Sequence, residues 1–276
     1  MHRFSQVDVF TDRLTTGNPL AVVHDADDLT DEQLVAFARW TNLSETTFLL
    51  RPTDPAADYR VRIFTVDGEL PFAGHPTLGS AAAWLAAGGE PRDADHLVQQ
   101  CEVGLVPVRR EGDRLAFAAP PLLRSGPLSV DEVDELTRWL GVPADAVVDA
   151  QWVDNGPGWV GVLVRDAATV LAARPSGPGT FRDVGIIGPY PPGAECAVEV
   201  RALFAVGDGL AEDPVTGSLN ASLAQWLIAT GRLPTAYVAA QGTVLGRRGR
   251  VHVSAEGEDV WVGGRVTPGI SGTVAL

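Results

Sequence analysis

The chain has 276 residues, of which 45% are hydrophobic and 20% charged, a balance typical of globular proteins and unlike that of disordered chains. Its formal net charge of −14 and its pI near 4.7 would repel phosphate backbones and anionic lipid, which disfavours nucleic acid and membrane surfaces as partners. The sequence has no apolar run of the ~18–20 residues that span a bilayer and no apolar leader, so we expect a cytoplasmic protein.

The first third of the chain is predicted to be rich in short strands. Alternating apolar residues indicate strands at 4–10, 20–23, 47–50 and 59–65. A helix separates the second strand from the third, because Thr30 and Gln33 have the spacing of a capping box ahead of an apolar helical face.

The later part of the chain again mixes helices and strands. Ser129 and Glu132 form a second predicted capping box, and Gly141 is expected to end that helix as its C-cap. Predicted hairpins cover 151–164 and 251–266, and a buried strand covers residues 197–206.

The chain is predicted to form two halves. Paired prolines and a glycine interrupt regular structure between residues 119 and 128. We therefore expect halves at 1–120 and 121–276, and we leave open that the terminal segment crosses back to the first half. The mixture of elements lacks a regular β-α-β alternation, so the predicted fold class is α+β.

A short pattern, xPxxGS, occurs twice. Residues 74–80 read GHPTLGS and residues 212–218 read EDPVTGS, which places His75 and Asp213 in corresponding positions, 213 − 75 = 138 residues apart. An apolar strand precedes each copy and an apolar helix follows it, so we predict two similar halves around a pseudo-two-fold axis.

The two predicted helix starts could bind an anion. The first amides of a helix lack intrahelical partners and the helix dipole adds partial positive charge, so both starts together could hold a substrate carboxylate. The residues concerned are Gly79, Ser80, Gly217 and Ser218. The plainer alternative is that they only begin and cap helices.

Three side chains are candidates for proton transfer. If the halves face one another, His75 and Asp213 would approach a bound molecule from opposite sides, as removal and return of a proton require. Glu45 stands among hydroxyl residues just before a strand, and partial burial would raise its pKa from ~4.3 toward the operating pH. The alternatives are an ordinary hydrogen-bonded histidine and a solvated loop carboxylate.

Several segments resemble hallmark sequences of the PhzF-like isomerases of phenazine biosynthesis. They are GNPLAVV, NLSETTFLL, ELPFAGHPTLGSAAAW, AEDPVTGSLNASLAQWL and, near the carboxyl end, AAQGTVLGRRGRVHV. The match runs in order from about residue 4 to the end of the chain. The resemblance implies the diaminopimelate epimerase-like fold, in which two pseudo-symmetric halves each have a mixed sheet curled around a central helix.

The cysteines separate this chain from other enzymes of that fold. In its epimerases and proline racemases a cysteine begins each of the two turns, whereas here those places hold His75 and Asp213. Cys101 and Cys196 lie elsewhere, so racemisation by two thiolates is disfavoured.

The resemblance also implies roles for particular residues. Glu45 would be the principal acid/base, and His75 and Asp213 would assist proton handling or orient the substrate. The substrate carboxylate would be held by Gly74, Gly217 and Ser218. The family reaction shifts a proton within a dihydro-hydroxyanthranilate ring and needs neither a metal nor an organic cofactor.

We therefore predict a cofactor-independent isomerase that acts on a small carboxylate-bearing metabolite. An epimerase, a tautomerase or ring-closure step in secondary metabolism, and a ligand-binding protein without turnover stay open as alternatives. Relatives are commonly homodimers, which leaves a homodimer open for this chain.

Overall fold

The computed structural model describes residues 1–176, 180–206 and 209–276. The chain divides into two compact units, of which unit 1 comprises Met1–Ala118 with Gly263–Leu276 and unit 2 comprises Ala119–Val262. Each unit combines a mixed sheet with few helices, so the predicted α+β class is confirmed.

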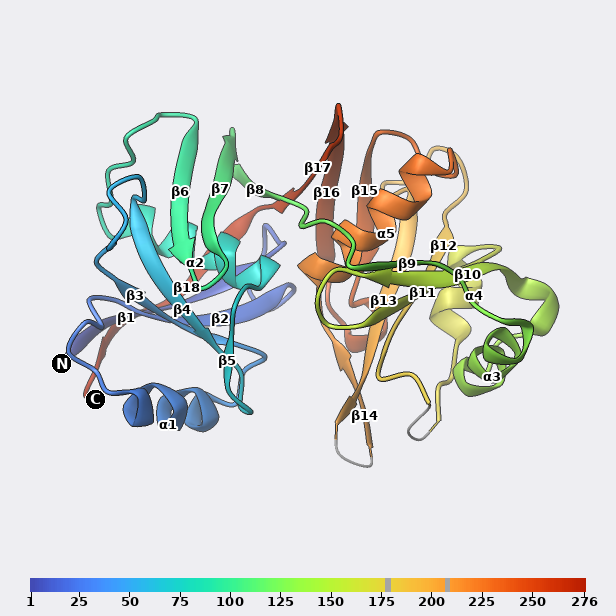
Figure 1. Ribbon diagram of the computed structural model, residues 1–276, viewed down its shortest axis with the longest axis horizontal. Helices are drawn as coiled ribbons and strands as arrows, with labels where there is room; N and C mark the ends of the chain where they lie inside the picture. The colour runs from blue at the N-terminus through green and yellow to red at the C-terminus, as the bar shows by residue number, and fades with distance from the viewer. Residues whose placement is uncertain (177–179, 207–208) are drawn as a thin grey trace. The chain divides into compact units, whose positions relative to one another are not determined.

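The sheet of unit 1 has the strand order β18–β1–β2–β3–β4–β6–β7–β8, with the short β5 beside β4 (Figure 1). The pairs β2–β3 and β4–β6 are parallel and the other pairs are antiparallel. The elements of this unit are β1 (His2–Val9), β2 (Asn18–Val23), α1 (Asp31–Thr41), β3 (Thr46–Leu50), β4 (Tyr59–Phe64), β5 (Glu69–Leu70), α2 (Gly74–Ala86), β6 (His96–Cys101), β7 (Gly104–Glu111), β8 (Arg114–Ala118) and β18 (Val266–Val274).

Helix α2 is the core element of unit 1. It contacts β1, β2, β3, β4, β6, β7, β8 and β18, so the sheet curls around it. Close approach requires Gly79, because a Cβ atom there would lie 2.5 Å from Cδ2 of Leu20 and 3.0 Å from Cγ2 of Val9. The helix is buried from Gly74 to Ala81, which explains why its sequence is apolar on all sides.

Unit 2 repeats this arrangement. Its sheet has the order β9–β10–β11–β12–β13–β15–β16, with β14 beside β13, and the pairs β11–β12 and β13–β15 are parallel. Helix α5 packs on the sheet, where Leu219 and Leu223 lie against Gly185 and Gly161. The elements are β9 (Arg124–Pro127), α3 (Val130–Leu140), β10 (Val147–Asp154), β11 (Trp159–Val164), α4 (Ala167–Ala172), β12 (Asp183–Pro189), β13 (Val198–Val206), β14 (Gly209–Asp213), α5 (Gly217–Ala229), β15 (Ala236–Gln241), β16 (Gly249–Glu256) and β17 (Asp259–Gly264), which crosses into unit 1 at Gly263.

The locally encoded helix ends are as predicted. Thr30 and Ser129 each accept a hydrogen bond from the amide three residues on, and the side-chain oxygens of Gln33 and Glu132 each accept one from the amide of the cap residue. Gly141 ends α3 in the left-handed conformation, with φ 65°.

The internal repeat exists, but its register differs from the prediction. Helix α2 begins at Gly74 and α5 at Gly217, so corresponding positions are 217 − 74 = 143 residues apart, not 138. In this register ELPFAGH, residues 69–75, aligns with EDPVTGS, residues 212–218.

A duplicated ion pair supports the new register. On the β4–β5 hairpin Arg62 binds both carboxylate oxygens of Glu69, and on the β13–β14 hairpin Arg201 binds Glu212 in the same way. Each glutamate precedes the first residue of the following helix by five positions, 74 − 69 and 217 − 212. The counterpart of His75 is therefore Ser218.

Two sequence expectations are corrected by this register. Asp213 is the last residue of β14 and precedes α5 by four positions, so it does not lie in the first turn of a helix. Gly79 and Ser80 lie more than one turn inside α2, where their amides bond within the helix, so they cannot form an anion site. Gly74, Gly217 and Ser218 do lie in first turns.

Candidate functional site

In unit 1 the structure brings together Glu45 and His75. Glu45 directly precedes β3, and His75 is the second residue of α2. Oε2 of Glu45 lies 3.3 Å from Nδ1 of His75, and their side chains are only 16% and 5% exposed. A solvated loop carboxylate, the plainer alternative for Glu45, does not fit this burial.

The imidazole of His75 is neutral at physiological pH. Burial lowers its pKa from 6.5 to about 3, although the backbone carbonyl of Pro19 favours the protonated form. The contact with Glu45 is therefore one between a carboxyl group and a neutral ring. Such a ring can accept or donate a hydrogen bond without cancelling the charge of a carboxylate.

Buried hydrogen bonds fix the elements that carry this pair. Ser80 of α2 donates to Oγ1 of Thr47 on β3, at 2.9 Å, which ties the helix to the strand that follows Glu45. Thr77 accepts a hydrogen bond from Gln99 of β6, also at 2.9 Å. The amino-terminal half of α2 is thus hydrogen-bonded to β3 and to β6.

In unit 2 a buried network surrounds Asp213. Thr216, the N-cap residue of α5, donates its hydroxyl to Oδ2 of Asp213 at 2.6 Å. Gln241 on β15 is fully buried and donates to Oγ1 of Thr216 at 2.9 Å and to the carbonyl of Asp213 at 3.2 Å. Its Oε1 accepts from the amide of Thr216 and from Nδ2 of Asn220, which uses the whole hydrogen-bonding capacity of the amide.

Ser218, in the first turn of α5, is held by the β10–β11 hairpin. Nε1 of Trp159 donates to Oγ of Ser218 at 3.1 Å, and Nδ2 of Asn155 donates to its carbonyl at 2.9 Å. An indole N–H can only donate, so the hydroxyl of Ser218 accepts this bond and its own hydrogen is directed elsewhere. The hydroxyl of Ser218 can therefore donate one further hydrogen bond.

The predicted site residues thus form two groups. Glu45, His75 and Gly74 belong to unit 1, and Asp213, Gly217 and Ser218 belong to unit 2. Sequence reasoning missed Trp159, Thr216 and Gln241, which support the second group. The one sequence signal was a glutamine, Gln241, at the end of the apolar strand AYVAAQ, and only the structure shows that it is fully buried.

One cavity of unit 1 lies away from Glu45 and His75. It has a volume of about 370 Å³, is lined by Ala87 and Gly88 beyond the end of α2, and includes neither Glu45 nor His75. The assignment of Glu45 and His75 to a candidate site is therefore based on the contact between their side chains and not on this cavity.

Thiol chemistry is disfavoured by the environment of both cysteines. Cys101 and Cys196 are buried free thiols, and desolvation raises the pKa of each, which suppresses the reactive thiolate. Neither residue is in the first turn of α2 or α5.

Among residues 1–176, 180–206 and 209–276 no cluster of histidine, cysteine and carboxylate side chains has the arrangement of a metal site. The helices described within those ranges are all too short or too polar to cross a bilayer.

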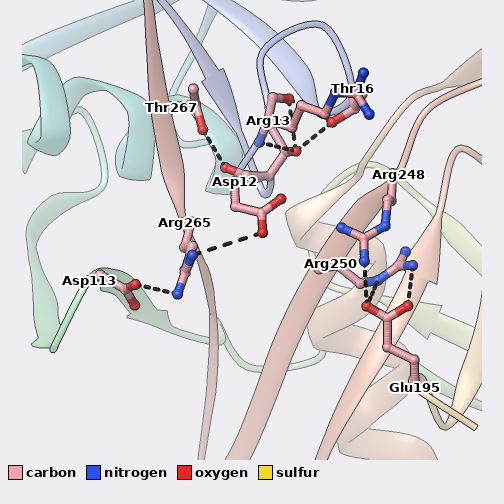
Figure 2. Close-up of polar contacts among 10 residues, drawn as sticks. Asp12, Arg13, Thr16, Asp113, Glu195, Arg248, Arg250, Arg265 and Thr267 are labelled. Carbon is pink, nitrogen blue, oxygen red and sulfur yellow. Dashed lines mark hydrogen bonds and ion pairs between the residues drawn. The ribbon is translucent and has the colours of Figure 1, made fainter.

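Two arginines at the start of β16 share one carboxylate. Arg248 and Arg250 both bind Glu195, with N–O distances of 2.7 and 3.0 Å (Figure 2). The charges of these two arginines are thus directed toward a carboxylate of their own unit, as expected of a turn between strands rather than of a nucleic-acid surface.

Comparison with known proteins places the chain in a family. The family described as phenazine biosynthesis-like protein, PhzC-PhzF, matches residues 7–272. The chain is 34% identical over 270 residues to the trans-2,3-dihydro-3-hydroxyanthranilate isomerase of Pseudomonas aeruginosa, and the match covers 93% of this chain and 91% of the relative.

Solved structures show the same fold. A predicted epimerase from Pseudomonas aeruginosa has a TM-score of 0.81 at 28% identity, with both chains fully covered. A probable proline racemase from Agrobacterium radiobacter has a TM-score of 0.61 at 15% identity, covering 100% of this chain and 93% of the racemase, which confirms the predicted fold. The chain belongs to the PhzC-PhzF family of phenazine biosynthesis-like proteins and is an isomerase of that family.

Proposed function

We propose that the protein is a cofactor-independent isomerase that moves a proton within a small carboxylate-bearing metabolite, with Glu45 as the acid/base. The observation that carries this proposal is the buried contact of Glu45 with His75, 3.3 Å between Oε2 and Nδ1. A mostly desolvated carboxylate beside a neutral ring keeps its ability to take up a proton, because no positive charge on the ring competes for it.

His75 would orient Glu45 and take part in its hydrogen bonding as the proton is carried. Nδ1 of His75 lies 3.3 Å from Oε2 of Glu45, so a small movement of either side chain would let Nδ1–H donate to the ionised carboxylate. A neutral ring does this without placing a positive charge beside the group that removes and returns the proton.

The carboxylate of the substrate would be held by first-turn groups. The amides of Gly74 and Gly217 belong to the two helix starts, and the hydroxyl of Ser218 is made a donor by Trp159. We propose that these groups and Asp213 act on the same substrate as Glu45. The relative from Pseudomonas aeruginosa supplies the substrate class, a dihydro-hydroxyanthranilate.

Turnover of the Glu45→Gln variant tests the proposal. With trans-2,3-dihydro-3-hydroxyanthranilate as substrate, we expect kcat to fall by about 10²- to 10⁴-fold, because general acid/base catalysis contributes about that much. The melting temperature should change little, since glutamine has the same size. In D₂O, mass spectrometry of the product should show less solvent deuterium at a given time than the wild type gives.

The matched control is Glu90→Gln, an exposed residue of the same unit, which should keep wild-type turnover. Undiminished turnover in Glu45→Gln would remove Glu45 from the mechanism. Deuterium returned to the carbon that lost hydrogen would indicate an epimerase, and binding without exchange or turnover would indicate a ligand-binding protein.

A further inference from the structure

A chain of buried hydrogen bonds runs from β4 to the first turn of α2. The hydroxyl of Tyr59 on β4 donates to Oε1 of Gln99 on β6, at 3.1 Å, and the two residues lie opposite one another in the parallel pairing of these strands. Nε2 of Gln99 donates to Oγ1 of Thr77, at 2.9 Å, and that hydroxyl donates to the carbonyl of Ala73, also at 2.9 Å. Tyr59, Gln99 and Thr77 are each no more than 1% exposed, so water does not compete for these bonds.

All bonds of this chain point the same way, because its last acceptor is a carbonyl oxygen. The carbonyl of Ala73 can only accept, so the hydroxyl hydrogen of Thr77 is directed at it. Oγ1 of Thr77 then accepts from the NH₂ group of Gln99, which turns Oε1 of Gln99 toward the phenol of Tyr59. Burial raises the pKa of the Tyr59 phenol well above its ordinary value, so this group keeps its proton and stays a donor.

The chain ends on the peptide that joins Ala73 to Gly74. Ala73 is the N-cap residue of α2 and makes no side-chain hydrogen bond to the first turn of the helix. Its carbonyl receives two donors from one residue, Oγ1 of Thr77 at 2.9 Å and the amide of Thr77 at 3.2 Å. Because a peptide unit is planar, the bonds that hold the carbonyl of Ala73 also set the direction of the N–H of Gly74. They polarise the same peptide and so make that N–H a stronger donor.

We propose that Thr77 and Gln99 are positioning residues that aim the amide of Gly74 at the substrate carboxylate, with Tyr59 as the donor that orients Gln99. This inference rests on the proposed function, in which Gly74 is one of the carboxylate donors. It names the side chains that set the direction and the strength of that donor. Because Tyr59, Gln99 and Thr77 are buried, they act through the peptide and do not touch the substrate themselves.

NMR of the intact protein observes this peptide directly. Alanine labelled with carbonyl ¹³C and glycine labelled with ¹⁵N select peptides in which glycine follows alanine, and the sequence has two, Ala73–Gly74 and Ala87–Gly88. The second lies at the other end of α2 and is the internal control. In Thr77→Val, which keeps the shape but lacks the hydroxyl, we expect both Ala73–Gly74 signals to move to lower frequency, because the peptide loses a donor that polarises it. Thr77→Ser, which keeps the hydroxyl, should restore them.

Kinetics with trans-2,3-dihydro-3-hydroxyanthranilate separate substrate binding from chemistry. We expect KM of Thr77→Val to rise about fivefold, the effect of one weakened hydrogen bond, while kcat stays within about twofold of the wild type. Thr77→Ser should have the KM of the wild type. Val61→Ala, which truncates a buried side chain of β4, should lower the melting temperature but leave KM and the Ala73–Gly74 signals unchanged. A merely structural role of Thr77 would give the pattern of Val61→Ala.

Unchanged Ala73–Gly74 signals in Thr77→Val would overturn the inference, whatever the kinetics show. Signals that move without a rise in KM would overturn it too, and the acid/base part of the proposed function would still be decided by Glu45→Gln. If the wild type does not turn over this compound, the proposed function fails at its substrate and the NMR signals alone decide on the inference. If Thr77→Val does not fold, Tyr59→Phe replaces it. The same signals should then move in the same direction by a smaller amount, and unchanged signals overturn the inference.

Discussion

Burial changes the protonation of His75 strongly. Its pKa of about 3 means that the folded protein resists protonation of the ring, while the unfolded chain takes up that proton below about pH 6.5. The folded state therefore binds fewer protons, and the contribution of His75 to stability is lost as the pH falls from about 6.5 toward 3. Burial and, to a smaller extent, the charge of Arg3 also lower the pKa of His24.

We predict that His75→Gln reduces the acid sensitivity of the protein. Between pH 6.5 and pH 4 the free energy of unfolding should fall less steeply than in the wild type, by up to about 1.4 kcal/mol per pH unit, the slope for one proton. Urea denaturation at a series of pH values measures this. Parallel curves for His75→Gln and wild type would contradict the prediction.

At the scale of elements, the packing of α2 on the sheet depends on a helix residue without a side chain. Alanine at position 79 would favour the helix by up to ~1 kcal/mol. Its Cβ would nevertheless lie 2.5 Å from Leu20 and 3.2 Å from Val7, on strands whose side chains are buried and cannot move freely. The steric cost exceeds the gain in helix propensity.

We predict that Gly79→Ala lowers the free energy of unfolding by about 1–3 kcal/mol, the usual cost of overpacking a core. Equilibrium denaturation in urea measures the change. Gly68→Ala is the matched control, because a Cβ there meets no atom within 4 Å. A Gly79→Ala variant as stable as the wild type would contradict this prediction, because it would mean that the neighbouring side chains of β1 and β2 can shift to accommodate the added methyl group.

The sequence predicts elements well where the signals are local. The capping boxes at Thr30 and Ser129 involve residues three positions apart, so four letters are enough to recognise them. The register of the internal repeat failed because Pro76, Gly79 and Ser80 matched Pro214, Gly217 and Ser218 by letter alone. The feature that the two halves share is a hairpin whose second strand carries Glu69 or Glu212. In the first half this strand, β5, has only two residues and is too short to show apolar alternation.

The candidate residues could be picked out from the sequence, but their contacts could not. Nothing local in SET or GHP indicates that Glu45 and His75 come within 3.3 Å, because that contact depends on how α2 lies against β3. Thr216 and Gln241 are 25 residues apart, and their role depends on a parallel strand pairing that no local pattern reveals.

At the scale of the whole molecule, unit 1 is completed by the last residues of the chain. Strand β18 pairs with β1 along its length, from His2 opposite Val274 to Val9 opposite Val266. Arg265 reaches Asp113 at 2.5 Å and Asp12 at 3.9 Å, and Thr267 donates to the carbonyl of Thr11 (Figure 2). The returning segment is therefore part of the sheet.

We predict that removal of residues 266–276 destabilises unit 1 selectively. Without β18, the outer edge of β1 loses its hydrogen-bond partners. Amide hydrogen exchange should then become faster in β1 and β2 and stay unchanged in β11 and β12 of unit 2, which serve as the internal control. Equal acceleration in both units would contradict the assignment of the returning segment to unit 1.

The position of β18 also has a consequence for biosynthesis. The two ends of the chain lie side by side in unit 1, so the first strand to leave the ribosome waits for the last one before its sheet is complete (Figure 1). Unit 2 is translated in full before that happens. The usual order, in which the amino-terminal domain matures first, is thus reversed for these two units, and the edge of β1 stays unpaired until β18 has been made.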